Sequence, residues 1–235
     1  MTLRICTLYP DLLGTYGDGG NAMVLSRRAS WRGFAVETSF VQAGEKVPVA
    51  DLYCLGGGED GPQVRAAELL RADQTLRQTL ADGAVLLAVC AGFQLIGNSF
   101  AAGKDRQVEG LGLLDISTTR SSEPRAVGEV MAQVTAPSLS GLPPLSGFEN
   151  HGGRTRLGPL VTPLGVVTSG VGNGFARDEG AVSGRIVATY LHGPVLARNP
   201  LLADKLLTWA LGVDELAPLD DDFHDRLREE RGLKA

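Results

Sequence analysis

Apolar and polar positions in the first hundred residues alternate between short apolar runs and longer amphipathic stretches. The short runs predict strands at residues 3–9, 34–41, 51–55 and 84–90. The amphipathic stretches predict helices at residues 21–33, 62–82 and 91–101. Strands that alternate with helices in this way predict an α/β fold, in which a mostly parallel sheet is covered on both faces.

The pattern changes at Leu111, where the sequence becomes rich in turns and short β-like segments. These segments predict strands at residues 111–119, 126–135, 165–171 and 184–192. A last amphipathic helix is predicted near residues 201–211. We therefore assign residues 1–212 to one domain. Residues 213–235 are expected to be an acidic tail, either mobile or a short docking helix.

The composition narrows the class of protein. A chain of 235 residues with 43% hydrophobic and 21% charged residues has the composition of an ordinary globular protein. A net charge of −5 gives no basic field for nucleic acid or for an anionic membrane. No apolar stretch approaches the roughly 20 residues of a membrane helix. An odd number of cysteines in apolar runs favours a reducing compartment, so we expect a cytoplasmic protein.

Cys90 differs from the other cysteines because it stands between a buried strand and a predicted helix, in "LLAVCAGFQL". A side chain on such a turn projects from the carboxyl edge of the sheet, as in a nucleophile elbow. The N–H groups of the following helix, that of Ala91 above all, stabilise a thiolate or an oxyanion. The alternative is a small buried hydrophobe, which is how we interpret Cys6 and Cys54.

A thiol nucleophile needs a base, and the chain has three histidines. His192 ends an apolar strand in "TYLHGP", so its ring is expected at the same sheet edge as Cys90. His151 lies in the glycine-rich segment "GFENHGGR" and is either scaffolding, part of a substrate loop or a rival base. His224 lies in the acidic tail and is expected to be solvated.

Two glycine-rich segments resemble nucleotide-binding motifs, but neither has both the spacing and the place after a strand that its motif requires. "GDGGNA" at residues 17–22 matches the dinucleotide fingerprint but does not follow its strand directly. "GNSFAAGKD" has the wrong spacing for a phosphate loop and ends in Asp105 where a magnesium-binding hydroxyl is required. No histidine and cysteine cluster has metal-ligand spacing, so we expect no metal site and no cofactor in this chain.

Three segments in order, "GGGEDG", "VCAGFQ" and "TYLHG", resemble the class I glutamine amidotransferases. "GFENHGGRT" and "YLHGP" resemble the branch that includes cobyric acid synthase-type glutaminase domains. "LYPDLLGTYGDGGNAMVL" and "EGLGLLD" are most similar to GatD-type glutaminase subunits of lipid II isoglutaminyl synthase. The resemblance covers nearly the whole chain and implies a flavodoxin-like, three-layer α/β sandwich.

The resemblance also implies roles for particular residues. Cys90 matches the family nucleophile and His192 its base, while Gly57 lies in the glycine turn that lines the oxyanion site together with Ala91. Gln94 matches the glutamine of the elbow motif.

A substrate-binding arginine is also implied, and Arg120 and Arg125 both qualify. We choose Arg125 because it lies three residues before the Gly128–Glu129 pair. Many class I enzymes carry an acid two residues after the histidine, where this chain has Pro194. We therefore expect either a Cys–His dyad or a carboxylate from a partner chain at His192 Nδ1.

The implied activity is hydrolysis of L-glutamine to glutamate and ammonia. By resemblance, a MurT-type, Mur-ligase-like partner that uses ATP and magnesium passes this ammonia to lipid II, in a heterodimer that serves cell wall synthesis and cell shape. Three alternatives remain open: a glutaminase subunit for cobyrinate amidation, a non-catalytic binding module on the same fold, and a nucleotide-binding oxidoreductase.

Overall fold

The computed structural model describes residues 2–103 and 106–230. Within these residues the largest sheet has six strands in the order β13-β14-β4-β3-β1-β2. Neighbouring strands from β14 to β2 run parallel, and β13 pairs antiparallel with β14. The strands are β1 (Thr2–Leu8), β2 (Ala35–Val41), β3 (Leu52–Leu55), β4 (Val85–Val89), β13 (Ala181–Ser183) and β14 (Ile186–Thr189). The prediction of a mostly parallel sheet is confirmed.

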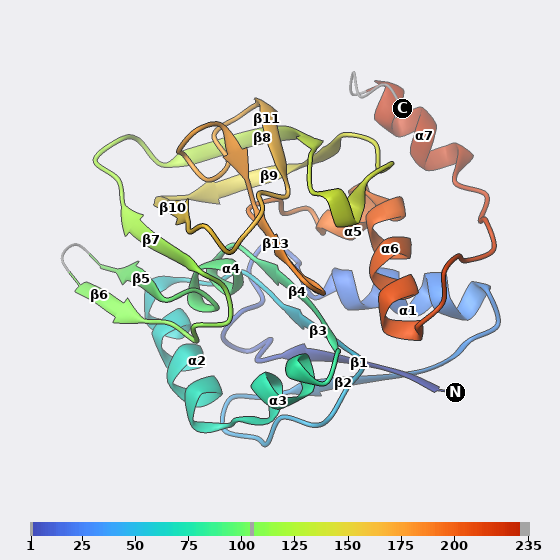
Figure 1. Cartoon of the computed structure of the whole chain (residues 1–235), viewed down its shortest axis with the longest axis horizontal. Coiled ribbons are helices and arrows are strands. Elements are labelled where there is room, and N and C mark those ends of the chain that lie inside the picture. The colour runs from blue at the N-terminus through green and yellow to red at the C-terminus, as the bar shows by residue number, and fades with distance from the viewer. Residues whose placement is uncertain (1, 104–105, 231–235) are drawn as a thin grey trace.

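Helices cover both faces of this sheet (Figure 1). On one face, α1 (Gly20–Trp31) and α6 (Pro200–Leu211) pack against each other, with the short α5 (Val195–Arg198) beside them. On the other face lie α2 (Asp60–Ala72), α3 (Thr75–Ala81) and α4 (Ala91–Leu95). The arrangement is a three-layer α/β sandwich. Its central strands are fully covered, and every residue of β4 is buried.

The second half of the chain adds two smaller sheets, each of four strands within the described residues, in the orders β10-β7-β5-β6 and β12-β11-β8-β9. The first of them contacts α4, which follows the carboxyl end of β4 (Figure 1). Their strands are β5 (Ser99–Ala102), β6 (Arg106–Glu109), β7 (Ile116–Arg120), β8 (Ala126–Val134), β9 (Leu145–His151), β10 (Gly153–Leu157), β11 (Gly165–Ser169) and β12 (Asp178–Glu179), with a 3₁₀ turn at Pro137–Leu139.

Two predicted helices are shorter than the sequence pattern suggested. The helix expected at residues 62–82 breaks at Asp73, whose carboxylate accepts the N–H groups of Thr75 at 2.9 Å and Val47 at 2.8 Å. The helix expected at residues 91–101 ends at Leu95. A side chain at Gly97 has no room against Ile116, and the chain continues into β5. In both places a tertiary contact overrides a local helical pattern.

The acidic tail leaves α6 at Gly212 and forms α7 (Asp222–Glu230). A buried arginine on α1, Arg28, joins the tail to the body of the protein. Its guanidinium pairs with Asp204 of α6 and with Asp221 at the start of the tail helix, each at 2.7 Å. In residues 2–103 and 106–230 no helix is long and apolar enough to span a bilayer.

Asp221→Asn is expected to lower the free energy of unfolding by about 1–3 kcal/mol at pH 7, because it weakens hydrogen bonds to a charged, buried guanidinium. Hydrogen bonds from Arg28 hold the pKa of Asp221 below its ordinary value. The stabilisation is therefore present above the ordinary aspartate pKa and is lost as pH falls through the lowered one. Urea unfolding and limited proteolysis at residues 213–220 measure the change. The control is Asp214→Asn, an exposed tail residue; equal behaviour of the two variants would contradict the anchoring role.

Candidate active site

Cys90 forms a sharp turn between β4 and α4. Its backbone has φ 52° and ψ −103°, a conformation that side-chain-bearing residues rarely adopt and that costs on the order of 1–3 kcal/mol. The residue is held in this position by its N–H, which donates to Thr189 O at 2.9 Å. The predicted nucleophile elbow is therefore present. The helix behind it has only five residues, so its contribution is the local N–H groups rather than a long helix dipole.

The other two cysteines differ from Cys90 in surroundings. Cys6 and Cys54 lie within β1 and β3 and are buried. Burial raises the pKa of both thiols, so they stay protonated at neutral pH. They are the small core residues that the sequence suggested.

His192 follows β14, one strand away from Cys90 on the same edge of the sheet. Two backbone hydrogen bonds with Phe148 of β9 hold it, one at 2.8 Å and one at 3.0 Å. The imidazole is 1% exposed, and no hydrogen-bond partner in the described residues reaches its Nε2. Burial lowers the pKa of His192, but interactions with Asp18 and Cys90 outweigh burial and raise it to about 10. A Cβ placed on Gly57 would lie 2.7 Å from His192 Cε1 and 3.5 Å from Cys90 Cβ, so the imidazole and the Cys90 side chain lie close together.

The Nδ1 atom of His192 lies 3.0 Å from Asp18 Oδ2 and 3.1 Å from Asp18 Oδ1. Because a carboxylate only accepts hydrogen bonds, Nδ1 carries a proton and donates it to Asp18, and Nε2 lies on the side of the ring away from this carboxylate. The expectation of a partner-chain carboxylate, or of a bare dyad, was wrong. Asp18 of the same chain occupies that position, from the loop that precedes α1.

The loop before α1 reaches the site through left-handed backbone at three residues, Tyr9, Tyr16 and Gly17. It docks on the glycine turn after β3, where the Thr15 N–H donates to Gly57 O at 3.1 Å. The ring of Tyr16 lies 4.9 Å from the His192 ring and covers it from outside. This loop delivers Asp18 to the base.

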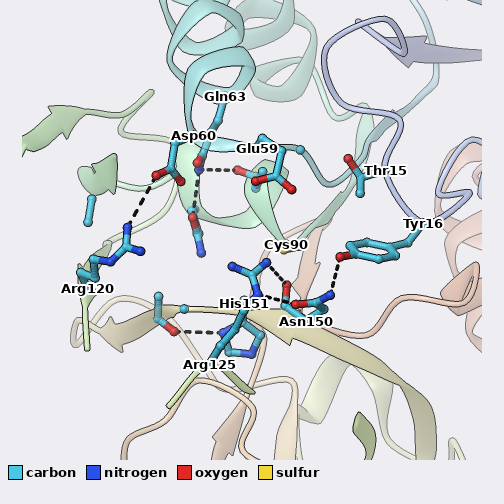
Figure 2. A pocket seen from close by; sticks show the side chains of 16 residues that line it. Thr15, Tyr16, Glu59, Asp60, Gln63, Cys90, Arg120, Arg125, Asn150 and His151 are labelled. Carbon is cyan, nitrogen blue, oxygen red and sulfur yellow. Dashed lines mark hydrogen bonds and ion pairs between the residues drawn. The ribbon is translucent and has the colours of Figure 1, made fainter. Parts of the chain in front are cut away.

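A polar cavity of about 150 Å³ opens beside Cys90. Its wall combines both signs of charge with neutral polar groups (Figure 2). The side chains that line it include Thr15, Tyr16, Glu59, Asp60, Gln63, Cys90, Gln94, Arg120, Arg125, Asn150 and His151. A cavity with acidic and basic groups around a thiol suits a small zwitterion.

The sequence and fold have known relatives. Residues 4–200 match the family model of the CobB/CobQ-like glutamine amidotransferase domain. The GatD subunit of lipid II isoglutaminyl synthase from Streptococcus pneumoniae is 33% identical to this chain, over 94% of this chain and 86% of the relative. The GatD subunit from Staphylococcus aureus is 34% identical, over 87% of this chain and 83% of the relative. Cobyric acid synthase of Methylorubrum populi is 35% identical over 67% of this chain but only 32% of its own length.

Among solved structures, PurLQS from Thermotoga maritima contains a chain with the same fold. Its TM-score is 0.62 at 16% identity, with 90% of this chain and 99% of that chain covered.

This chain belongs to the CobB/CobQ-like glutamine amidotransferases. It is a glutamine-hydrolysing enzyme of the class I amidotransferase fold, as the resemblance implied.

The glycine turn of this amidotransferase differs from the sequence expectation in one respect. The N–H of Gly57 does not face the cavity, because it donates to Asp18 Oδ2 at 2.8 Å. Gly58 and Ala91 line the cavity instead, and no acceptor in the described part of the chain takes their N–H groups. We therefore transfer the proposed oxyanion role from Gly57 to Gly58 and retain it for Ala91.

Gln94 lies in the wall of the amidotransferase cavity within a buried network. It accepts a hydrogen bond from Gln63 Nε2 at 3.0 Å and donates one to the Tyr190 hydroxyl at 3.1 Å. Tyr190 is also hydrogen-bonded to Thr155 at 2.6 Å. The network joins the elbow to the segment that carries the base.

The two candidate arginines both line the cavity from different elements (Figure 2). Arg120 lies 3.6 Å from Asp60, and Arg125 hydrogen-bonds both the side chain and the backbone carbonyl of Asn150. The geometry brings both to the site and leaves the choice of Arg125 a prediction.

His151 does not have the geometry of a base. Its ring stacks on Tyr190 at 3.7 Å, with Nδ1 3.0 Å from Gly153 O and Nε2 3.4 Å from Glu149. Both ring nitrogens therefore face oxygen atoms and neither is available to a thiol. His224 lies on α7, remote from Cys90 in sequence and absent from the cavity wall.

Asp18 is the residue that sequence reasoning missed. In the sequence, "GDGGNA" resembles a nucleotide-binding motif, and the expected place for a carboxylate that pairs with His192 is two residues after the histidine. One signal was available, since the segment "LYPDLLGTYGDGGNAMVL" carried much of the family resemblance without a role for its acid. Asp18 and His192 are 174 residues apart, so no local motif in the sequence indicates that they pair.

His192→Gln is expected to remove a pH-dependent part of the stability of the amidotransferase. Because the folded-state pKa of His192 is raised to about 10, its stabilisation is full below pH 6.5 and declines as pH rises toward 10. The difference in unfolding free energy between wild type and variant should shrink by roughly 2–5 kcal/mol across this range. Urea titrations from pH 6.5 to 9.5 measure it, with His224→Gln as the control. If the unfolding free energies of wild type and His192→Gln changed with pH in parallel, the raised pKa of His192 would be refuted.

Proposed function

We propose that this chain is the glutaminase subunit of a lipid II isoglutaminyl synthase. The observation that carries the proposal is the similarity to GatD subunits over most of both chains, combined with a cavity in which a strained cysteine lies beside a buried histidine. The substrate is free L-glutamine, and the ammonia is delivered to a second protein.

The first half of the reaction forms a thioester. The Cys90 thiolate attacks the side-chain carboxamide carbon of glutamine, and the N–H groups of Gly58 and Ala91 stabilise the oxyanion. His192 Nε2 then gives its proton to the nitrogen as the C–N bond breaks, and ammonia leaves. Asp18 keeps the Nδ1 proton in place throughout, so the ring presents Nε2 to the reacting atoms.

The second half regenerates the enzyme. His192 Nε2 takes a proton from water, whose oxygen attacks the thioester carbon. The tetrahedral adduct collapses, the C–S bond breaks, and glutamate leaves with Cys90 as the thiolate and His192 protonated.

The charged rim of the cavity fits the backbone of a free amino acid. We assign the α-carboxylate of glutamine to Arg125 and its α-ammonium group to the acidic side chain of Glu59, with Asp60 beside it in the cavity wall. Opposite charges on one rim discriminate against a peptide-bound glutamine, which lacks both groups.

Ammonia acts as a nucleophile only while it is unprotonated, so it is expected to pass to its acceptor without mixing with bulk water. We propose a MurT-type, Mur-ligase-like partner as the acceptor protein, joined to this chain as a heterodimer in the cytoplasm. The partner uses ATP and magnesium to activate the α-carboxyl of D-glutamate in the lipid II stem peptide, and amidation gives D-isoglutamine. The pair would serve peptidoglycan synthesis and cell shape.

Cobyrinate amidation is the second candidate. Its support is the similarity to cobyric acid synthase, which covers only 32% of that protein, whereas the similarity to GatD covers 86% and 83% of the two relatives. A non-catalytic module is disfavoured because the structure keeps a strained Cys90 close to a buried Asp18–His192 pair, an arrangement that suits an activated thiol nucleophile.

Cys90→Ala is expected to abolish glutamine-dependent amidation of lipid II by the complex and to leave ammonia-dependent amidation intact. The reason is that only the first requires the thiolate. Glutamate release and lipid II amidation are measured with the co-purified ligase partner, and Cys54→Ala serves as the matched buried-cysteine control. A Cys90→Ala variant that hydrolyses glutamine at the normal rate would show that the nucleophile is elsewhere. If the wild-type complex amidated a cobyrinate but not lipid II, cobyrinate amidation would be favoured as the function.

Arg125→Gln is expected to raise the KM for glutamine by about 10- to 100-fold with a much smaller change in kcat, because a charge-assisted hydrogen bond to the α-carboxylate contributes roughly 1.5–3 kcal/mol. Steady-state glutaminase kinetics measure both constants. Arg120→Gln is the comparison variant at the other side of the cavity. A larger KM effect at Arg120 would transfer the carboxylate to that residue.

A further inference from the structure

The loop before α1 holds the glycine turn from two sides. Asp18 Oδ2 accepts the N–H of Gly57 at 2.8 Å, while Gly57 O accepts the N–H of Thr15 at 3.1 Å. Both polar backbone groups of Gly57 are therefore bound by one loop. A second tie joins the turn to the elbow, because the N–H of Gly92 donates to Gly56 O at 3.1 Å. The position of the turn thus depends on contacts beyond its own strand.

The same carboxylate contacts the base. The Asp18 side chain is 0% exposed, and its Oδ2 atom lies 3.0 Å from His192 Nδ1 as well as 2.8 Å from Gly57 N. Water does not replace either donor at a fully buried atom, so both groups depend on this carboxylate for a partner. The base and the glycine turn therefore both bind the same oxygen atom, Asp18 Oδ2.

The glycine turn, the histidine and the carboxylate are also closely packed. A Cβ on Gly57 would lie 2.7 Å from His192 Cε1, 3.2 Å from Asp18 Oδ2 and 3.5 Å from Cys90 Cβ. Gly57 has a negative φ, so the glycine is required here by close approach and not by backbone conformation. The turn therefore has no room to move toward the imidazole or the Cys90 side chain.

The direction of the N–H groups follows from this arrangement. The N–H of Gly57 points to Asp18 and away from the cavity, whereas Gly58 and Ala91 line the cavity. A carbonyl attacked by Cys90 would therefore meet the N–H groups of Gly58 and Ala91. The Gly58 N–H belongs to the Gly57–Gly58 peptide, whose carbonyl oxygen accepts the N–H of Thr15, and this peptide meets the Gly56–Gly57 peptide held by Asp18 at the Gly57 Cα. If Gly57 lost its contact with Asp18 and moved, the N–H of Gly58 would move with it.

We propose that Asp18 is a positioning residue with two separable effects. It orients His192, and it holds the N–H of Gly57 so that the next peptide of the turn presents the Gly58 N–H, with that of Ala91, to the carbonyl oxygen under attack. The inference rests on the proposed glutaminase chemistry and describes how that site is assembled. The second effect does not pass through the histidine.

A double-mutant comparison separates the two effects. Asp18→Ala is made in the wild type and in a His192→Ala background, and labelling of Cys90 is followed by mass spectrometry with two reagents. Iodoacetamide reports only the availability of the thiolate. The glutamine-like diazo-ketone 6-diazo-5-oxo-L-norleucine also requires binding and polarisation of its carbonyl, and it takes up a proton and loses N₂ as the C–S bond forms.

In the His192→Ala background, Asp18→Ala is expected to slow diazo-ketone labelling at least tenfold while iodoacetamide labelling changes less than about twofold. No change with either reagent would overturn the second effect and leave Asp18 acting through His192 alone. Equal slowing with both reagents would also overturn it, because that result means general loss of the pocket. Asp11→Ala, in the same loop, is the control that should leave both rates unchanged.

Asp18→Asn keeps the test informative if Asp18→Ala does not fold. Its side chain accepts one of the two N–H groups and opposes the other with its own NH₂, so kcat for glutamine should fall by about 100-fold or more with KM within a few-fold. A wild-type kcat in this variant would overturn the proposal. Failure of the proposed function is recognised separately, because the wild type would then neither hydrolyse glutamine nor react with the diazo-ketone.

Discussion

The contact between the Asp18 carboxylate and the His192 imidazole is the constraint on which the rest of the site depends. Both side chains are removed from water, and an unpaired charge in that position would cost several kcal/mol. The pair is therefore stable only when each partner is held close to the other. That requirement explains the left-handed turns before α1, the glycine at position 57 and the hydrogen bonds that bind β9 to the histidine segment.

A second buried carboxyl group supports the segment that carries the base. Glu179 on β12 accepts hydrogen bonds from the Thr189 hydroxyl at 2.5 Å and from the Tyr190 N–H at 2.9 Å. Burial raises the pKa of Glu179 to about 7, and these hydrogen bonds only partly oppose it. The small sheets of the second half thus contact the carboxyl edge of the main sheet, through Glu179 and through the hydrogen bonds between Phe148 and His192. They hold the end of β14 so that His192 enters the site in one orientation.

The elbow was predictable because it is a local feature. A continuous apolar strand, a cysteine and two small residues specify the turn at Cys90 within a few positions, and strand order then places it at the carboxyl edge of the sheet. His192 was predictable for the same reason, since a strand delivers it to that edge. The inert character of Cys6 and Cys54 also followed from their places within strands.

The breaks in the predicted helices and the orientation of the glycine turn were harder to predict from the sequence. The pattern at residues 62–82 is helical throughout, yet Asp73 binds the distant N–H of Val47 and the helix breaks there. Gly57 and Gly58 are adjacent glycines with the same conformational freedom, and only the position of Asp18 decides which N–H faces the cavity.

The amino-acid sequence by itself determined the α/β class and the places of Cys90 and His192 at one edge of the sheet, because each depends on periodicity or on contacts between neighbours in the chain. Only the tertiary structure decided what orients the histidine. Asp18 and His192 are 174 residues apart, and no periodic pattern connects them. Their contact exists because β1 and β14 end at the same edge of one sheet, where a buried carboxylate requires a donor and finds it in the imidazole.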